Sequence, residues 1–503
     1  MHRPSTLVAV GAGTVLTAAL IAPAFAAAPT DTTELRDEVT VEGVRDHQRA
    51  LQRIANRNDD TRASGTPGYD ASADYVAEAL EDAGYTVARQ EFTFDLFRQE
   101  GPSTLALSPA GPSEPYVDEE DFLVMEYSGT GTATGALQAV DVTLPPPAQS
   151  GSTSGCEATD FAGFTAGNIA VIQRGTCTFR QKADNAAAAG AVGAIIFNEG
   201  QEGRTELLSG TLSQPQVGIP VLGTTFALGE ELVAAEGSTA TMSTDVSVTE
   251  DIPTENVIAD STWGRTDRTV MAGAHLDSVL EGPGINDNGS GVGAILETAE
   301  QLADQEETEN AVRFAFWGAE ESGLIGSQHY VDSLSARALK DIMLYLNFDM
   351  VGSPNFVRFV YDGDGSTFGV AGPTGSGHIE DTFNAYFASQ GLASEPTQFD
   401  GRSDYDAFIN AGVPAGGLFT GAEGIKTEEQ AAVYGGTAGV AYDPCYHAEC
   451  DDFRNVSIPG LDQMSDAVAH ATLVYADSQS TVTGTAEGSG GGPTQMRGHH
   501  RVR

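Results

Sequence analysis

Three apolar segments of strand length, each ending in ionisable residues, constrain this chain more than any other feature. From Asn256 onward, apolar segments alternate with segments of helical periodicity, in the order RTVMAGAHL, GVGAILETAEQLADQ, AVRFAFWGAEE and IMLYLNFD. A further helical pattern covers about 326–339. Such alternation predicts a mostly parallel sheet with helices on both faces. The predicted fold class is therefore α/β, with a mixed, mostly parallel central sheet.

The ends of these apolar segments carry the chemistry. His275 and Asp277 follow the first segment, Glu320 and Glu321 follow the second, and Asp349 follows the third. In open α/β sheets, residues just past the carboxyl ends of strands line one shared crevice. We therefore expect these five side chains to converge.

Two more residues have the right chemistry to join this crevice. The segment GINDNGSG places Asp287 among glycines that allow close backbone approach, just ahead of a helix expected to begin near Ser290. His447 comes much later in the chain, in YHAEC.

A metal is the simplest way to neutralise so many acids in a partly dry crevice, because no Lys or Arg lies within VMAGAHLD, GINDNGSG, FAFWGAEE or LYLNFD. Two imidazoles with three carboxylates suit zinc better than Ca²⁺ or Mg²⁺, which prefer oxygen ligands alone. Five ligands exceed one tetrahedral site. They suit two zinc ions about 3.5–4 Å apart that share a carboxylate and activate a bridging water.

The N-terminus predicts export. His2 and Arg3 precede an apolar run, and Ala24 to Ala26 offers a small-residue cleavage site, so we predict a signal peptide over 1–28. A membrane anchor is the rival interpretation. The run is interrupted by Gly and Thr, and no later apolar stretch is long enough to span a bilayer.

The charge of the chain excludes some partners. Asp and Glu number 71 against 25 Lys and Arg, giving a formal charge of −46. Nucleic acid and anionic membranes are therefore not expected to bind. A salt-adapted surface and ordinary acidic drift both explain the charge, and the sequence does not separate them.

Four cysteines in an exported chain predict two disulfides. Cys445 and Cys450 lie five residues apart and could close a small loop, whereas Cys156 and Cys177 lie together in an earlier segment. Zinc binding by these thiols is the alternative, but no CxxC spacing is present.

A second α/β unit interrupts the first. A helix over about 69–83 and a strand over 89–97 precede a stretch rich in Pro, Gly, Ser and Thr over about 101–155, which marks a domain boundary. The segment that follows has the order strand, helix, strand, strand, helix. Its passage IAVIQRGTCTFRQKADNAAAAGAVGAIIFNE resembles the protease-associated domain.

The predicted domain limits follow from these features. We predict a peptidase domain over 33–131 and 248–480, a protease-associated insert over 132–247, and a disordered Gly-rich tail over 481–503.

The motifs GAHLDSV, GINDNGSG, FWGAEESGLIGS, YLNFDMVGSPN, GRSDYDAF, GGLFTGAEG and CYHAEC resemble secreted two-zinc aminopeptidases of the M28 family, of the Streptomyces aminopeptidase type. The resemblance covers roughly Arg49 to Tyr475. It implies that His275 and Asp349 bind one zinc, Glu321 and His447 bind the other, and Asp287 bridges both. It also implies a cis peptide bond after Asp287.

The same resemblance implies the remaining roles. Asp277 orients the His275 ring, Glu320 is the general base, and Tyr446 donates a hydrogen bond to the oxyanion. Glu320, Asp349 and the Arg402 region surround the free α-ammonium of the substrate. A packed aromatic is the rival interpretation of Tyr446, and a loop cap is the rival interpretation of Arg402.

Calcium is a further possibility. Asp462 and Asp466 match calcium-binding positions of some relatives, but they are equally explained as acids in the first turn of a helix. The DGDG segment at 362–365 lacks a twelve-residue loop with a terminal Glu, and we predict a hairpin turn there.

The sequence thus predicts a secreted, monomeric zinc aminopeptidase with two Zn²⁺ per chain. It would cleave peptides with a free N-terminus and release single residues, with large apolar residues such as leucine implied by the family. The alternatives are a related carboxypeptidase, a glutaminyl-cyclase-like enzyme with one zinc, and a binding relative that has lost catalysis. A complete ligand set disfavours the cyclase, and intact Glu320, Glu321 and histidines disfavour the binding relative.

Overall fold

The computed structural model describes residues 30–108, 115–201, 204–305, 308–480 and 482. The predicted signal peptide lies outside this part of the chain, as does the predicted tail apart from Val482. Among the described residues, no helix has the length and apolar character needed to cross a membrane.

The central sheet of the larger unit is mixed, as predicted. Four strands at its centre, in the order β13, β10, β8 and β9, run parallel to one another, and antiparallel pairs flank them on both sides. The strands of this unit are β8 (Arg265–His275), β9 (Asn310–Trp317), β10 (Ile342–Phe348), β11 (Phe359–Tyr361), β12 (Glu395–Thr397) and β13 (Ala415–Phe419).

The four central strands are buried on both faces over most of their length, which explains why they contain nearly continuous apolar runs. In β9, Phe314 and Phe316 pack into one core, whereas Ala315 and Trp317 pack into the core on the opposite face. This is the two-residue period of a strand with a hydrophobic layer on each side.

Helices supply those layers. The first core is covered by α1 (Thr33–Glu38), α2 (Val41–Ala55), α3 (Pro67–Asp82), α6 (Gly289–Ala303), α9 (Ser376–Ser389) and α12 (Ile458–Ala476). The second is covered by α7 (Ile325–Ser333), α8 (Ala336–Asp341) and α10 (Tyr405–Asn410). The short helix α11 (Glu428–Tyr434) buries none of its residues.

The inserted unit repeats this layered plan on a smaller scale. Its elements are β2 (Phe122–Val124), β3 (Gly131–Val140), a 3-10 turn at Ala158–Phe161, β4 (Ile169–Gln173), α4 (Phe179–Ala188), β5 (Gly193–Phe197), β6 (Val221–Thr224) and α5 (Phe226–Ala234). Strands β3, β4, β5 and β6 are parallel in that order. The order strand, helix, strand, strand, helix predicted for 169–234 is confirmed.

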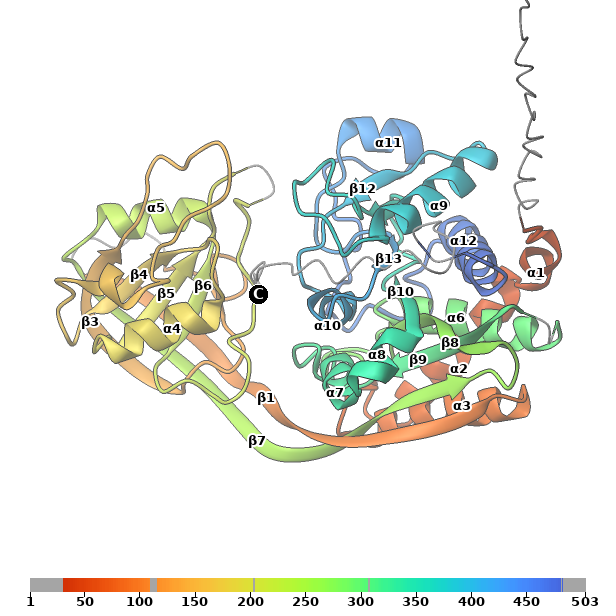
Figure 1. Cartoon of the computed structure of the whole chain (residues 1–503). Coiled ribbons are helices and arrows are strands. Elements are labelled where there is room, and N and C mark those ends of the chain that lie inside the picture. The colour runs from red at the N-terminus through yellow and green to blue at the C-terminus, as the bar shows by residue number, and fades with distance from the viewer. Residues whose placement is uncertain (1–29, 109–114, 202–203, 306–307, 481, 483–503) are drawn as a thin grey trace, which may run out of the picture.

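A long two-stranded ribbon joins the two units. Figure 1 shows β1 (Thr86–Ser108) and β7 (Thr239–Asp260) running from the sheet of the larger unit to the inserted unit, where β7 pairs with β3. The strand predicted over 89–97 therefore continues to Ser108, into the Pro- and Gly-rich stretch. The predicted limit at 247/248 falls within β7, and the domain limits stay a prediction.

Two local predictions were wrong. The single helix expected over 326–339 is two helices, because Leu334 is extended and the Ser335 side chain caps a new helix by accepting from the backbone N–H of Ala338. The hairpin turn expected at 362–365 is also wrong: this segment leads from β11 toward α9 rather than into an antiparallel strand.

Candidate metal centre

The carboxyl ends of β8, β9 and β10 meet at one crevice, as the strand pattern predicts. His275 is the last residue of β8, Glu320 and Glu321 follow β9, and Asp349 follows β10. Glu320 and Asp349 are 8% and 9% exposed, so the acids lie at the edge of the core with little access to water. All four residues line the same pocket.

Two groups of metal-ligand type form in this crevice. One contains His275, Asp287 and Asp349, and the other contains Asp287, Glu321 and His447; within each group the ligand atoms lie within 4.8 Å of one another. Asp287 belongs to both groups. The structure therefore brings together the five residues that the family resemblance assigned as zinc ligands.

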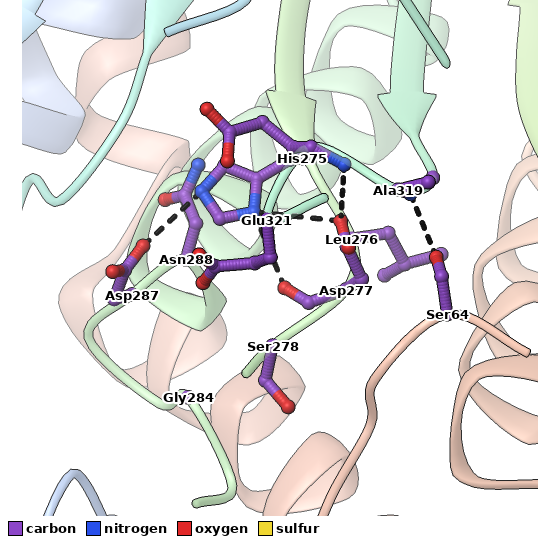
Figure 2. Close-up of polar contacts among 12 residues, drawn as sticks. Ser64, His275, Leu276, Asp277, Ser278, Gly284, Asp287, Asn288, Ala319 and Glu321 are labelled. Carbon is purple, nitrogen blue, oxygen red and sulfur yellow. Dashed lines mark hydrogen bonds and ion pairs between the residues drawn. The ribbon is translucent and has the colours of Figure 1, made fainter. Parts of the chain in front are cut away.

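The distances show how closely these residues approach. His275 Nε2 lies 3.1 Å from Asp287 Oδ1 and 3.3 Å from Asp349 Oδ1. His447 Nε2 lies 3.3 Å from Asp287 Oδ2 and 3.1 Å from Glu321 Oε2. The two oxygens of Asp287 thus face different histidines, and Figure 2 shows Asp287 and His275 joined in this way.

Uncommon backbone conformations occur at or beside these site residues. Ala319, Met350 and His447 have positive φ values of 52°, 49° and 54°, a conformation that costs energy for residues other than glycine. Each is a site residue or the neighbour of one. The peptide bond between Asp287 and Asn288 is cis, which confirms that prediction.

Asp277 lies beside His275, on the side away from Asp287 (Figure 2). The Nδ1 atom of His275 lies 3.2 Å from the Asp277 carbonyl oxygen and 3.7 Å from its Oδ1. Asp277 Oδ1 accepts a hydrogen bond from the backbone N–H of Glu320 at 3.2 Å. The closer contact to the ring is therefore made by the carbonyl, while the carboxylate holds the loop that carries Glu320.

Burial and crowding perturb the titration of these groups. Burial raises the pKa of Glu320 well above its usual value, and the charges of Asp404, Glu321 and Asp349 raise it further against the opposing effect of His275. Burial raises the pKa of Glu321 to about 7. Burial also lowers the pKa of His275, but the charges of Glu320 and Asp349 outweigh it and raise that pKa overall.

Zinc fits the donor set of this crevice. Glu321 Oε1 is buried without a protein hydrogen-bond partner, which is unfavourable unless a cation takes it up. Imidazole nitrogens and carboxylate oxygens are ligands that zinc prefers.

Tyr446, Arg402 and Glu423 form a connected group at the pocket. Arg402 Nη1 lies 2.7 Å from Glu423 Oε1, and Arg402 Nη2 donates to Tyr446 Oη at 3.2 Å. The Tyr446 ring stacks on the ring of His447 with centroids 3.8 Å apart. These contacts of Arg402 go to side chains, which argues against a role limited to capping a loop.

Both predicted disulfides are confirmed. Cys445 pairs with Cys450, so the bridge encloses Tyr446 and His447, and Cys156 pairs with Cys177 in the inserted unit. No cysteine is free. The small loop limits the conformations open to Tyr446 and His447.

Asp462 and Asp466 lie elsewhere, on α12. Because α12 begins at Ile458, neither residue is in its first turn, and that alternative explanation is wrong. Burial, followed by the charge of Asp462, raises the pKa of Asp466 to about 6.

Sequence reasoning missed a buried cation close to the crevice. Arg62 is fully buried and donates to the backbone carbonyls of Leu276, Pro283 and Gly284, thereby linking two loops of the site. Burial lowers its pKa to about 10, and the charge of Asp277 opposes this shift. Arg62 lies more than 200 residues from these loops in sequence, so no local pattern could have revealed it.

Three buried polar residues of this region were also missed, and two of them hydrogen-bond to a proposed ligand residue. Ser403 Oγ donates to Asp349 Oδ2 at 2.6 Å, and Asp451 Oδ2 accepts from the backbone N–H of Asp287 at 2.9 Å. Asp404 is buried with neither carboxylate oxygen hydrogen-bonded, and burial raises its pKa to about 7. Ser403 and Asp404 follow Arg402 directly, and Asp451 follows Cys450, so proximity to nominated residues was the available signal.

A mixed sheet whose parallel central strands end in imidazole and carboxylate side chains around a pocket is the arrangement of metal-dependent α/β hydrolases. Comparison with known proteins narrows this class. Residues 256–472 match Peptidase family M28, and residues 134–232 match the PA domain.

Curated relatives agree with these matches. The chain is 51% identical over 424 residues to an aminopeptidase of Pseudomonas aeruginosa, covering 84% of this chain and 78% of the relative. It is 44% identical over 450 residues to the probable lipoprotein aminopeptidase LpqL of Mycobacterium tuberculosis, covering 88% and 86%. It is 45% identical over 351 residues to leucine aminopeptidase 2 of Trichophyton equinum, covering 68% and 70%.

Solved structures share the fold. An aminopeptidase from Aneurinibacillus sp. strain AM-1 is 27% identical with a TM-score of 0.66, covering 88% of this chain and 95% of that one. The zinc aminopeptidase BSAP from Bacillus subtilis is 26% identical with a TM-score of 0.56, covering 89% and 98%. The chain belongs to peptidase family M28 and carries a PA domain, so it is a peptidase whose crevice holds a zinc-type ligand set.

Proposed function

We propose that this M28 peptidase is a secreted aminopeptidase that removes single residues from the N-terminus of peptides and proteins, using two zinc ions. The observation that carries the proposal is the pair of ligand groups that share Asp287. A shared carboxylate between two sets of N and O ligands is the arrangement of two-metal hydrolases. The relatives described as aminopeptidases support the same activity.

The proposed ligands follow the two groups. His275 and Asp349 would hold one zinc and Glu321 and His447 the other, with Asp287, which belongs to both groups, available to each. Zinc supplies a Lewis acid that polarises the scissile carbonyl and lowers the pKa of a water. The Asp277 carbonyl and carboxylate fix the His275 ring so that Nε2 faces Asp287 and Asp349.

Glu320 acts as the general base in this proposal. It lines the pocket beside Glu321 but is not part of either ligand group, so its carboxylate is available for proton transfer. Its raised pKa gives it the proton affinity to accept a proton from the attacking water. The same group then delivers a proton to the leaving amine.

In this proposal Tyr446 stabilises the oxyanion, and the carboxylates of Glu320 and Asp349 bind the α-ammonium group of the substrate. The Tyr446 hydroxyl accepts from Arg402, which leaves its own proton free to donate to the oxyanion that forms on the carbonyl oxygen. The carboxylates of Glu320 and Asp349 provide the negative charge that a free α-ammonium requires. Arg402 holds the wall of this subsite through Tyr446 and Glu423.

The pocket wall favours an apolar first residue. Met350, Tyr361 and Phe419 line it beside the acids. A large aliphatic side chain such as leucine would bury apolar surface there.

The proposal also covers the compartment in which the protein works, its oligomeric state, its domain limits and its partners. Two disulfides suit an oxidising, extracellular setting, in agreement with a signal peptide over 1–28. We propose a monomer with a peptidase domain over 33–131 and 248–480 and a protease-associated insert over 132–247. The strongly acidic composition disfavours nucleic acid and membrane partners.

Calcium binding at Asp462 and Asp466 stays a secondary proposal. Neither residue belongs to a group of three or more metal-ligand side chains among the described residues. A calcium ion there would need backbone oxygens or water to complete its shell.

A substrate comparison tests the activity. Purified protein should release leucine from leucine 4-nitroanilide and from free peptides, should lose this activity in 1,10-phenanthroline, and should regain it with added Zn²⁺. N-acetylated peptides of the same sequence serve as the matched control. Cleavage of the acetylated peptides but not the free ones would overturn the aminopeptidase assignment, and release from the C-terminus would favour the carboxypeptidase.

A further inference from the structure

A second group of acids gathers at the end of β11, away from the zinc-type ligands. The loop that follows this strand carries Asp362 and Asp364, and the helix α9 carries Glu380. One carboxylate oxygen from each of the three lies within 4.8 Å of the others. Glu380 Oε2 also accepts from the backbone N–H of Asp364 at 3.3 Å, which ties the loop to the helix.

Asp362 has an oxygen with no protein partner. The residue is fully buried, and its Oδ2 accepts from the backbone N–H groups of Thr367 at 3.0 Å and Phe368 at 2.8 Å. Its Oδ1 is buried without any hydrogen bond. Because Oδ2 accepts from two donors, Oδ1 is the oxygen of Asp362 whose hydrogen-bonding capacity the protein leaves unused. A buried carboxylate oxygen left in this state is unfavourable.

Among the residues that the structure describes, Lys, Arg and His do not contribute the main electrostatic effects on Asp364 or Glu380. Burial raises the pKa of Glu380, and the charges of Asp364 and Asp362 add to that rise, while the backbone N–H groups of Asp364 and Gly363 oppose it. The strongest effects on Glu380 thus include no Lys, Arg or His. Three carboxylates held together this closely repel one another, and a bound proton or a bound cation relieves that repulsion.

We propose that Asp362, Asp364 and Glu380 bind a calcium ion. The three donors are carboxylate oxygens, which calcium prefers, and the group lacks the nitrogen or sulfur ligands that zinc favours. Asp364 is exposed, so one side of the site is open for water molecules to complete a shell of six to eight oxygens. Magnesium demands a stricter octahedral shell and suits this uneven mixture of buried and exposed carboxylates less well.

The position of the site gives the ion a structural effect on the peptidase pocket. Tyr361, the residue before Asp362, lines that pocket, and so does Thr397. The backbone N–H of Asp362 donates to the Thr397 carbonyl at 2.8 Å. An ion bound to Asp362 and Glu380 would therefore tie α9 to the pocket wall and stabilise it.

Calcium titration of the zinc-loaded, full-length protein tests this site. The protein is freed of calcium on a chelating resin, its zinc content is checked by elemental analysis, and Ca²⁺ is added in a calorimeter and in thermal melts. We expect one saturable binding event and a rise in Tm of several degrees at saturation. Asp364→Asn and Glu380→Gln should each weaken Ca²⁺ binding at least about ten-fold, because each removes one of three charged ligands.

Two control variants locate the binding event. Asp381→Asn removes an exposed acid next to Glu380 on the same helix and should bind Ca²⁺ as the wild type does. Asp466→Asn removes an acid of the other candidate site and should also leave this event intact. Wild-type affinity in Asp364→Asn and Glu380→Gln would overturn the proposal, as would the absence of any calcium response, loss of the event only in Asp466→Asn, or a response to Mg²⁺ alone.

Discussion

Both α/β units of this chain place buried acids just after a strand of the sheet, but the two units differ in whether the carboxylate oxygens have protein partners. In the inserted unit, Glu199 follows the parallel strand β5 and is fully buried. Its Oε1 accepts from the backbone N–H groups of Gly151 at 2.6 Å and Ser152 at 2.8 Å, and its Oε2 pairs with Arg204 at 3.1 Å. Every oxygen of this carboxylate has a protein partner.

The peptidase crevice leaves comparable oxygens without partners. Glu321 follows β9, and its Oε1 has no protein hydrogen bond, and neither oxygen of Asp404 has one. A buried carboxylate with both oxygens paired is satisfied within the fold, whereas an unpaired buried oxygen is unfavourable unless a ligand takes it up. The contrast shows that the state of pairing at the strand ends, more than their position, separates a functional site from a structural one.

Substituting one buried acid in each unit should give the largest difference in kcat/KM between two variants. Asp287→Asn should lower kcat/KM by about 10³-fold or more, because the carboxylate shared by both ligand groups loses its charge. Glu199→Gln should leave kcat/KM within about two-fold and lower the free energy of unfolding by about 1–3 kcal/mol. Steady-state kinetics and urea unfolding of both variants provide the measurement. An activity loss in Glu199→Gln as large as that in Asp287→Asn would break the comparison.

Lys182, a buried charge of the inserted unit, should make the free energy of unfolding depend on pH. It lies on α4 with its Nζ donating to the carbonyls of Ser154 at 2.5 Å and Gln173 at 3.0 Å, and burial lowers its pKa to about 8. Between pH 8 and 10.5 the unfolded chain therefore binds more protons than the folded one. Stability from this group rises with pH across that window, by up to about 3 kcal/mol.

The variant Lys182→Met should lose this pH dependence. Unfolding free energies of both proteins at pH 8 and pH 10 give the slope, and the difference between the proteins removes contributions from other titrating groups. Peptidase activity should stay unchanged at pH 8, because Lys182 lies in the inserted unit. Equal slopes in the two proteins would contradict the lowered pKa of Lys182 in the folded protein.

Substitution of Asp404 should give the smallest effect, a shift in the pH dependence of kcat/KM. Its charge raises the pKa of Glu320, so Asp404→Asn should lower that pKa and move the acidic limb of the kcat/KM profile to lower pH, by about half a unit. The profile of Asp406→Asn, an acid two residues further along the chain, is the control. A shift toward higher pH would mean that Asp404 does not act on Glu320 through its charge.

The sequence predicted the features that depend on local patterns. The apolar segments ending at His275, Glu320 and Asp349 are parallel strands that meet at one crevice, and Asn288 caps α6 close to the predicted start at Ser290. These predictions succeeded because a parallel strand buried on both faces leaves a continuous apolar run with an abrupt polar end.

Features that depend on contacts between residues far apart in the chain could not be predicted from local sequence patterns. Arg62 reaches loops more than 200 residues away, and Asp451 holds the backbone of Asp287 across 164 residues. The break between α7 and α8 depends on Ser335 capping a new helix, which the apolar period does not record. The ribbon of β1 and β7 continues through Pro and Gly because pairing along its length holds it as a strand.

Glu320 and Glu321 test the central claim most directly, since they are adjacent and chemically identical. The measurement is zinc content per chain together with kcat on leucine 4-nitroanilide, for Glu320→Gln and Glu321→Gln in parallel. Glu320→Gln should keep about two zinc ions per chain while kcat falls by about 10²–10⁴-fold. Glu321→Gln should lose zinc. Loss of zinc from Glu320→Gln, or activity within about two-fold of the wild type, would contradict the assignment of Glu320 as the base and Glu321 as the ligand.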